Sequence, residues 1–270
     1  MTGKLIKYEF RSSMRLIGLL WIGLLIAGLL IGVLDMATRE LVADSKVSYF
    51  IFNTIPSLIY FALFIAMIVA TFIIVVARFY NGLLGQEGYL MHTLPVKPWQ
   101  LITAKGIVAT IVIIIGMIVS IFSMLLINGL CDLGEVVRAI GNFFQALKLN
   151  STWVLIAIEG IIIVIFGVIK SIYQIYASLS IGQLVNKHRI LLSVGAYVGI
   201  TTALVIIFVL LMTVADSTEF DYMFTQTLPK LGEVGLVQAF MGLVFLVEAV
   251  QVVAFHIVSE RIMTKKLNLQ

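Results

Sequence analysis

Residues 106–130 read GIVATIVIIIGMIVSIFSMLLINGL and contain no Asp, Glu, Lys or Arg. The hydrocarbon core of a bilayer is about 30 Å thick, so a helix needs about 20 apolar residues to cross it. Only a structure that satisfies its own backbone hydrogen bonds is stable there, because lipid tails offer no partners. The stretch therefore predicts a membrane-spanning helix.

Five further stretches have the same character. The 270-residue chain is 61% hydrophobic and 12% charged, whereas soluble domains average about 45–50% and about 25%. This composition excludes an ordinary soluble enzyme. We expect an all-α integral membrane protein, a single transmembrane domain over residues 1–270. Its six predicted transmembrane helices are 16–34, 55–77, 106–130, 153–179, 191–215 and 235–258.

The charges indicate how these spans are oriented. Nine of the 14 acidic residues fall in the segments on one side of the membrane, and most of the 18 basic residues fall on the other. Because cytoplasmic segments are enriched in Lys and Arg, both termini are predicted to be cytoplasmic. The net charge of +4 thus reflects topology, and we do not expect a nucleic-acid partner. The basic residues on the predicted cytoplasmic side are Lys4, Lys7, Arg11, Arg15, Arg78, Lys97, Lys105, Lys170, Lys187, Arg189, Arg261, Lys265 and Lys266.

Residues 1–15 have the pattern of an amphipathic helix. Their four basic residues are spaced three or four apart and share one face, with Ile6 and Phe10 on another. We expect an interfacial helix that lies on the cytoplasmic surface before the chain turns into the first span, where it contacts anionic lipid or a partner. Of the predicted extracellular segments, 131–152 and 216–234, the first has the periodicity of a second interfacial helix.

Several motifs of enzymes and metal sites are missing from the sequence. There is no G-x-x-x-x-G-K-[ST] phosphate loop, no H-E-x-x-H and no G-x-S-x-G, and the three histidines lack metal-ligand spacing. We therefore expect no catalytic residue, no metal site and no cofactor bound by this chain.

The connection between the second and third spans, residues 78–105, is longer than adjacent spans require. A short helix is expected from Glu87 to Leu94, with Leu90 and Leu94 on one face and Pro95 ending it. Pro98 then suits the first turn of a helix leading into the third span. This cytoplasmic segment has two interpretations, a rigid element that fits a groove of another protein or an interfacial helix that packs on lipid.

The same segment carries a resemblance to a known family. Residues 87–105 match E-G-Y-L-x-x-T-L-P-V-x-x-W-Q-L-x-x-x-K, which resembles the loop between the second and third spans of bacterial ABC-2 type transporter permeases, particularly those of Gram-positive bacteria. Two further stretches agree, Lys-Tyr-Glu-Phe at 7–10 and Ser-Leu-Ser-Ile-Gly-Gln-Leu at 178–184.

The resemblance implies the membrane subunit of an exporter in the bacterial plasma membrane. Such a permease pairs with itself or with a second permease, and with two copies of a separate ATP-binding cassette subunit that holds ATP and Mg. Its cargo would be hydrophobic or amphipathic, such as an antimicrobial peptide, a drug or a lipid-like molecule. Residues 78–105 would form the coupling helix, with Leu90, Leu94 and Trp99 in the apolar contact and Glu87 and Lys97 as rim charges.

Polar residues inside the spans are the other candidates for function, because charged groups at bilayer depth usually face protein or water. Glu159 and Gln174 lie on the fourth span, and Glu248 and Gln251 on the sixth. They line a substrate path in one interpretation and form helix-to-helix hydrogen bonds within the subunit in the other. Two alternative functions also stay open: an ion-coupled secondary carrier that uses the two glutamates, and a non-transporting immunity or sensor protein.

Pairs of glycines mark where helices can approach closely. Gly28 and Gly32 in the first span, and Gly195 and Gly199 in the fifth, have the small-x-x-x-small spacing of helix interfaces. We expect these two spans to contribute to a dimer seam.

Overall fold

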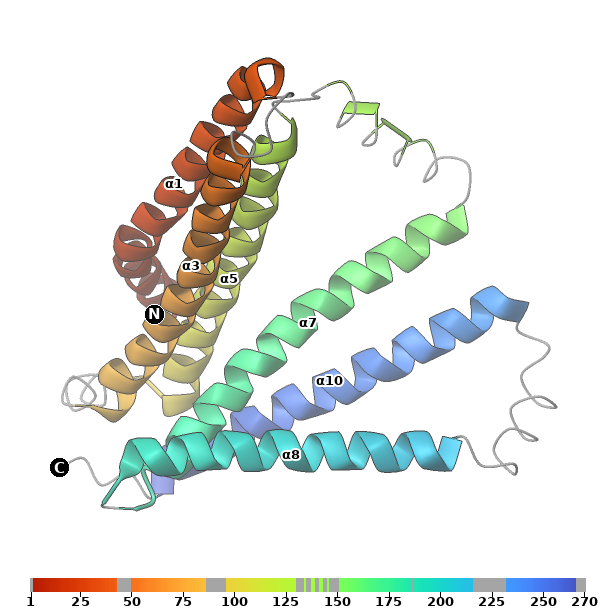
Figure 1. Cartoon of the computed structure of the whole chain (residues 1–270). Coiled ribbons are helices and arrows are strands. Elements are labelled where there is room, and N and C mark those ends of the chain that lie inside the picture. Colours follow the sequence, from red (N-terminus) through yellow and green to blue (C-terminus); the bar gives the residue numbers. More distant parts are fainter. Residues whose placement is uncertain are drawn as a thin grey trace. The chain divides into compact units, whose positions relative to one another are not determined.

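A computed structural model of the chain describes residues 2–42, 50–85, 96–129, 151–185, 187–215 and 232–265, with a few positions between 134 and 145. In this part of the chain every regular element is helical (Figure 1). The α-helices are α1 (Thr2–Val42), α3 (Ile55–Phe79), α5 (Pro98–Gly129), α7 (Ser151–Gly182), α8 (Arg189–Ala215) and α10 (Gly232–Lys265). Two short π-helices, η1 (Phe50–Thr54) and η2 (Tyr80–Leu84), flank α3.

Six helical stretches are long and apolar enough to cross a membrane. Each predicted span lies within one of them or extends past its end by a few residues. In the described residues the all-helical fold and the six apolar helices of spanning length are therefore confirmed. The stretches are Gly3–Thr38, Phe50–Leu84, Pro98–Ile127, Thr152–Gly182, Arg189–Leu211 and Val237–Thr264. They indicate a multi-pass membrane protein.

The first helix differs from the sequence-based expectation. We expected the amphipathic segment 1–15 to turn before the first span, but α1 is continuous from Thr2 to Val42. No proline interrupts this stretch, and its apolar face packs against other helices of the protein. Ile6, Phe10 and Met14 pack against the same hydrophobic cluster as the span itself, so the helix has no reason to break.

The start of α5 agrees with the prediction that Pro98 occupies a first helical turn. The side-chain oxygen of Gln100 accepts a hydrogen bond from the backbone N–H of Lys97 at 3.2 Å, and the Gln100 N–H donates to the Lys97 carbonyl at 2.9 Å. This is half of a capping box, with Gln three residues after the N-cap. The predicted helix 87–94 and most of the segment 216–234 lie outside the described residues.

The helices group into two compact units. One comprises Met1–Arg78 and Ile107–Ser151, and the other Phe79–Gly106 and Thr152–Gln270. The chain therefore passes from the first unit to the second after Arg78 and returns after Gly106. Residues 79–106, which connect the second and third spans, belong to the same unit as α7, α8 and α10.

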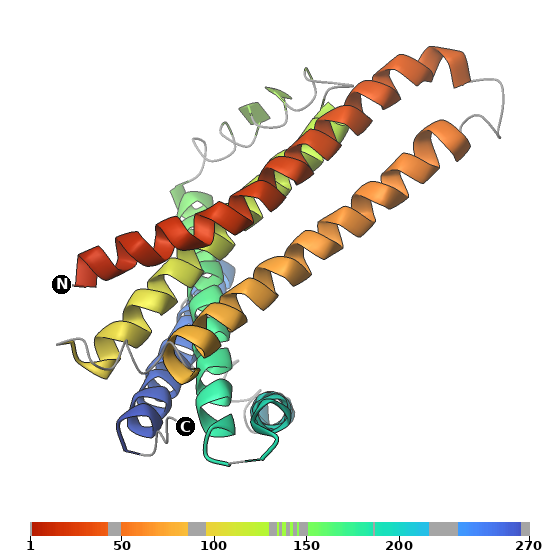
Figure 2. The ribbon, with the colours of Figure 1, turned by 90° about the vertical axis from the view of Figure 1, so that its left-hand side faces the viewer.

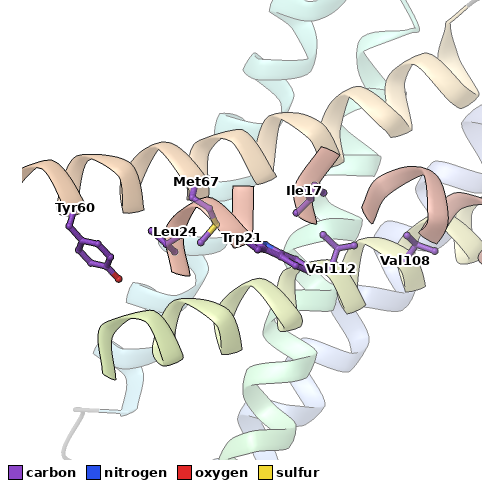
Figure 3. Packing of buried hydrophobic residues seen from close by; sticks show 7 residues of the cluster. All are labelled: Ile17, Trp21, Leu24, Tyr60, Met67, Val108 and Val112. Carbon is purple, nitrogen blue, oxygen red and sulfur yellow. The ribbon is translucent and has the colours of Figure 1, made fainter. Parts of the chain in front are cut away.

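In the first unit, α1, α3 and α5 lie side by side (Figures 1 and 2). Their core is a cluster to which all three helices contribute (Figure 3). Trp21, 5% exposed, lies between the α3 and α5 side chains of this cluster. The cluster consists of Ile17, Trp21, Leu24, Tyr60, Met67, Val108 and Val112.

Two consecutive hydrogen bonds link α3, α5 and α1 in the same unit. The Tyr60 hydroxyl donates to Ser123 Oγ at 3.0 Å, and Ser123 Oγ donates to the Leu24 carbonyl at 3.0 Å. A Cβ on Gly28 would lie 2.6 Å from Ser123 Oγ and 2.9 Å from its carbonyl oxygen. Gly28 therefore packs against α5 of the same chain, and the predicted dimer seam at the first and fifth spans stays a prediction.

In the second unit, α7 and α10 run in the same direction. Contacts join Gly160 to Met241, Phe166 to Phe245, and Tyr173 to His256. Because the numbers rise together on both helices, the pair is parallel. The helix α8 joins α7 through a tight turn, in which Gly182 packs on Ser193 and His188 has a left-handed backbone with φ of 59°.

Candidate functional site

One of the polar residues predicted inside the spans, Glu248 of α10, lies in the contact between α7 and α10. This contact, here called the polar seam, comprises Glu248 with Gly167 and Lys170 of α7. A Cβ on Gly167 would lie 3.2 Å from Glu248 Oε1. The absence of a side chain at Gly167 thus leaves the space that the Glu248 carboxylate occupies.

The two carboxylates of the fourth and sixth spans lie at different heights. Glu248 lies level with Gly167, and Glu159 precedes Gly167 by eight residues on α7. At 1.5 Å per residue, this separation is about 12 Å along the helix axis. One small group therefore cannot bind both carboxylates at once.

Three side-chain oxygen atoms of α7 and α10 are buried without a hydrogen-bond partner among the described residues. They are Glu159 Oε2, Glu248 Oε2 and Gln251 Oε1. All three are acceptors, since a carboxylate and an amide oxygen cannot donate. Lys170 lies near enough to Glu248 to act on it electrostatically, yet Glu248 Oε2 has no donor.

Gln174, also predicted for a substrate path, has a different role in the structure. Its Nε2 donates to Thr201 Oγ1 at 2.8 Å, and that hydroxyl donates to the Tyr197 carbonyl at 2.8 Å. Gln174 is 5% exposed and joins α7 to α8. The structure therefore places Glu248 in the contact between α7 and α10, and Gln174 in the contact between α7 and α8.

Four aromatic side chains pack together nearer the C-terminal ends of α7 and α10. They are Phe79, Tyr173, Tyr176 and His256. The rings of Phe79 and Tyr176 stack with centroids 3.7 Å apart, and Tyr173 meets the His256 ring edge-on at 5.4 Å. A Cβ on Gly106 would lie 2.8 Å from the Tyr173 hydroxyl. Both ends of segment 79–106 are thus held against α7, since Phe79 precedes η2 and Gly106 belongs to α5.

The described part of the expected coupling segment exposes two of its predicted contact residues. Lys97 is exposed and Trp99 is 41% exposed, whereas the next residues, Leu101 and Ile102, are buried. Glu87, Leu90 and Leu94 lie outside the described residues, so their predicted roles are untested.

The end of α3 is tied to the amino-terminal part of α1. Arg78 Nη2 donates to the Ser12 carbonyl at 2.5 Å and to Ser12 Oγ at 3.0 Å, and Arg78 Nη1 lies 3.8 Å from Glu9 Oε2. The guanidinium fork can hold several acceptors at once. Residues 9–12 of α1 are therefore held against the last turn of α3.

Sequence reasoning missed the residues that connect these features. Gly167, Phe79 and Tyr173 were not predicted as functional, because a single glycine or aromatic residue in an apolar span carries no distinctive pattern. One signal was present: Tyr173 and Tyr176 follow Lys170 within two turns of the helix, and such polar-tipped aromatic residues need partners where they are buried.

Comparison of the chain with protein-family models, with curated proteins and with solved structures gives no match. What the protein does is therefore inferred from its own residues.

Proposed function

We propose that this chain is the permease subunit of an ATP-binding cassette exporter. It pairs with itself or with a second permease in the bacterial plasma membrane, with both termini in the cytoplasm. Two copies of a separate subunit bind ATP and Mg and hydrolyse the nucleotide, while this chain moves a hydrophobic or amphipathic cargo. Six apolar helices and the resemblance of residues 87–105 to a coupling loop support the proposal.

The observation that carries it is the attachment of segment 79–106 to α7. The Phe79–Tyr176 stack holds one end of the segment, and the close approach of Gly106 to Tyr173 holds the other. Close-packed groups transmit displacement because they cannot be compressed. A partner that pushes on this segment would thus move α7, and through the Tyr173–His256 contact it would also move α10.

The partner contact is assigned to the exposed start of α5 and the loop before it. Trp99 supplies apolar area and Lys97 a rim charge, and Glu87, Leu90 and Leu94 complete the surface in this proposal. Aromatic residues at the centre of an interface commonly contribute most of its binding energy.

Co-purification tests this assignment. The chain is expressed with the ATP-binding subunit encoded beside it, and the amount of that subunit recovered on a tagged permease is measured. Trp99→Ala should reduce recovery about tenfold or more, since truncation of an aromatic anchor costs about 2 kcal/mol. Trp153→Ala is the matched control, because Trp153 is 61% exposed but lies at the opposite end of a span. Failure of the unaltered chain to retain the subunit would overturn the proposal.

A second candidate function is favoured by the unpartnered oxygens of Glu159 and Glu248. Carboxylates at bilayer depth serve proton relays in ion-coupled transporters, so the chain would then be a secondary carrier that needs no ATPase. Uptake or export in vesicles driven by a proton gradient alone, and abolished by Glu248→Gln, would favour this function over the exporter.

A further inference from the structure

One face of α1 is basic near the N-terminus and apolar further along. Its basic residues are exposed and fall within an arc of about 80° around the helix, at about 100° per residue. The same arc continues with the exposed apolar side chains of Ile22, Leu29 and Val33. The basic residues, here called the basic stripe, are Lys4, Lys7, Arg11 and Arg15.

The continuity of α1 sets the level of the basic stripe relative to the bilayer. The helix is unbroken from Thr2 to Val42, so the basic and apolar parts of this face are rigidly aligned. Leu19, 68% exposed, lies one turn after Arg15, which is about 6 Å along the axis. The headgroup layer on each side of the hydrocarbon core is about 5–8 Å thick. With Leu19 at the edge of the lipid tails, Arg15 therefore lies among the headgroups.

The opposite, apolar face of the N-terminal segment is occupied by protein. Ile6, Phe10 and Met14 pack on the hydrophobic cluster of the first unit. An interfacial helix usually binds a bilayer by burying its apolar face at the boundary between headgroups and acyl chains. Because that face is already used here, attraction of this segment to the bilayer must come from the basic stripe.

The charges of the basic stripe are not neutralised within the described part of the chain. Glu9 is the only acidic residue before Asp35, and it lies on the other side of α1, where its Oε2 is 3.8 Å from Arg78 Nη1. None of the four basic side chains makes a hydrogen bond or an ion pair with another described residue. Four positive charges on one exposed face attract anions.

We propose that the basic stripe binds anionic phospholipid in the leaflet where α1 begins. The guanidinium groups of Arg11 and Arg15 donate to the lipid phosphate, an acceptor that suits their planar fork. The acyl chains of the same lipid then lie along Leu19 and Ile22. The two lysines, which are further from the lipid tails, act through the negative potential of the surface.

The sequence alone leaves a protein partner open for these residues, and the structure favours lipid. The basic stripe is collinear with side chains that face lipid tails, so a protein that covered it would have to displace the headgroups beside Arg15. The proposal goes beyond the exporter function and does not depend on it, since lipid binding requires no ATPase.

Quenching of a fluorophore one turn from Arg15 tests the proposal. Leu19→Cys, in a Cys131→Ser background, is labelled with bimane, and the full chain is reconstituted in phosphatidylcholine nanodiscs. A small share of the lipid carries a nitroxide near the top of its acyl chain, on phosphatidylglycerol in one sample and on phosphatidylcholine in the other. Relative to phosphatidylcholine, phosphatidylglycerol should be enriched about fivefold beside the fluorophore, as expected for one basic residue near an anionic surface.

A second label position is the matched control. Val33 is exposed on the same side of α1 and lies about 21 Å from Leu19 along the axis. It is followed by Asp35 and has no basic residue within one turn. Bimane at Val33→Cys should therefore detect no enrichment of phosphatidylglycerol.

Two paired variants assign the effect to charge. Arg11→Gln with Arg15→Gln should lower the enrichment at position 19 to the value found at position 33. Arg11→Lys with Arg15→Lys keeps both charges and should retain most of the enrichment. All these substitutions are at exposed positions, and size-exclusion chromatography verifies that each variant is folded.

Equal quenching by the two lipids at position 19, or enrichment that is unchanged in the Arg→Gln pair, would overturn the proposal. If there is no enrichment at position 19 and the Arg→Gln pair instead reduces recovery of the ATP-binding subunit, the basic stripe is a protein contact. Failure of the unaltered chain to retain that subunit would overturn the exporter function and leave the lipid result intact, so the two proposals can fail separately.

Discussion

Phe79 and Tyr176 stack almost face to face, with ring centroids 3.7 Å apart and planes inclined by 12°. Both side chains are fully buried, at 0% and 1% exposure. Phe79 is the last residue of α3, and Tyr176 lies in the C-terminal half of α7. This one contact therefore connects the end of the second span to the fourth span, which carries Glu159 and Lys170.

The first prediction concerns the energy of this stack. Aromatic pairs contribute about 0.5–1.5 kcal/mol beyond the area that they bury. Phe79→Leu and Tyr176→Leu should each destabilise the protein, and the double variant should show a coupling energy in that range, because either single change already removes the stack. Equilibrium unfolding in mixed micelles measures the cycle. Additive effects would show that the two rings do not stabilise each other.

The second prediction compares the effect on stability of alanine at two glycines of α1. Gly28→Ala places a Cβ against the backbone and side chain of Ser123, so it should destabilise the protein by about 1–3 kcal/mol through overpacking. Gly23→Ala is the control, because no atom lies within 4 Å of the added Cβ. It should stabilise the helix by up to about 1 kcal/mol. Unfolding midpoints of the two variants give the comparison, and equal shifts would contradict the packing described for α1 and α5.

The third prediction tests the space beside Glu248. Gly167→Ala puts a Cβ 3.2 Å from Glu248 Oε1, so the carboxylate must shift, and the free energy of unfolding, measured in mixed micelles, should fall by about 1–3 kcal/mol through overpacking. Gly160→Ala adds the same methyl group about two turns nearer the N-terminus of α7, where it meets only Met241 Cε at 3.7 Å. That variant should leave the free energy of unfolding unchanged or slightly raised. The reverse order of effects would show that Gly167 does not leave space for the Glu248 carboxylate.

The fourth prediction concerns orientation in the membrane. In a Cys131→Ser background, a membrane-impermeant maleimide applied to intact cells should label Arg138→Cys and should not label Lys4→Cys until the membrane is permeabilised. The uneven distribution of Lys and Arg is the physical reason. The singly substituted Cys131→Ser chain is the blank. Labelling of Lys4→Cys in intact cells would reverse the predicted topology.

The number and position of the spans could be predicted from the sequence, because a lipid-facing helix must be apolar over a fixed length. The start of α5 at Pro98 could be predicted for a similar local reason, since proline lacks the N–H that a first helical turn does not need. The continuity of α1 could not be predicted from the sequence. It depends on Ile6 and Phe10 packing against the first unit's cluster, and an amphipathic pattern alone does not distinguish lipid from protein as the apolar partner.

The candidate site was predicted in part. Glu159, Glu248 and Gln251 were identified because polar residues are rare in apolar spans, and the structure places Glu248 in the contact between α7 and α10. The pairing of these two helices could not be predicted, since it depends on the shapes of Gly167, Phe166 and Phe245. For the same reason the hydrogen bond from Gln174 to Thr201 of α8 could not be predicted.

The central claim is that the start of α5 contacts an ATP-binding subunit, and photo-crosslinking from Trp99 tests it most directly. A photo-crosslinking amino acid replaces Trp99 in cells that express the neighbouring ATP-binding subunit, and replaces Trp153 in a matched sample. We predict a crosslink between this chain and the ATP-binding subunit from position 99 and none from position 153. Absence of that crosslink from position 99, or equal crosslinking from both positions, would contradict the account.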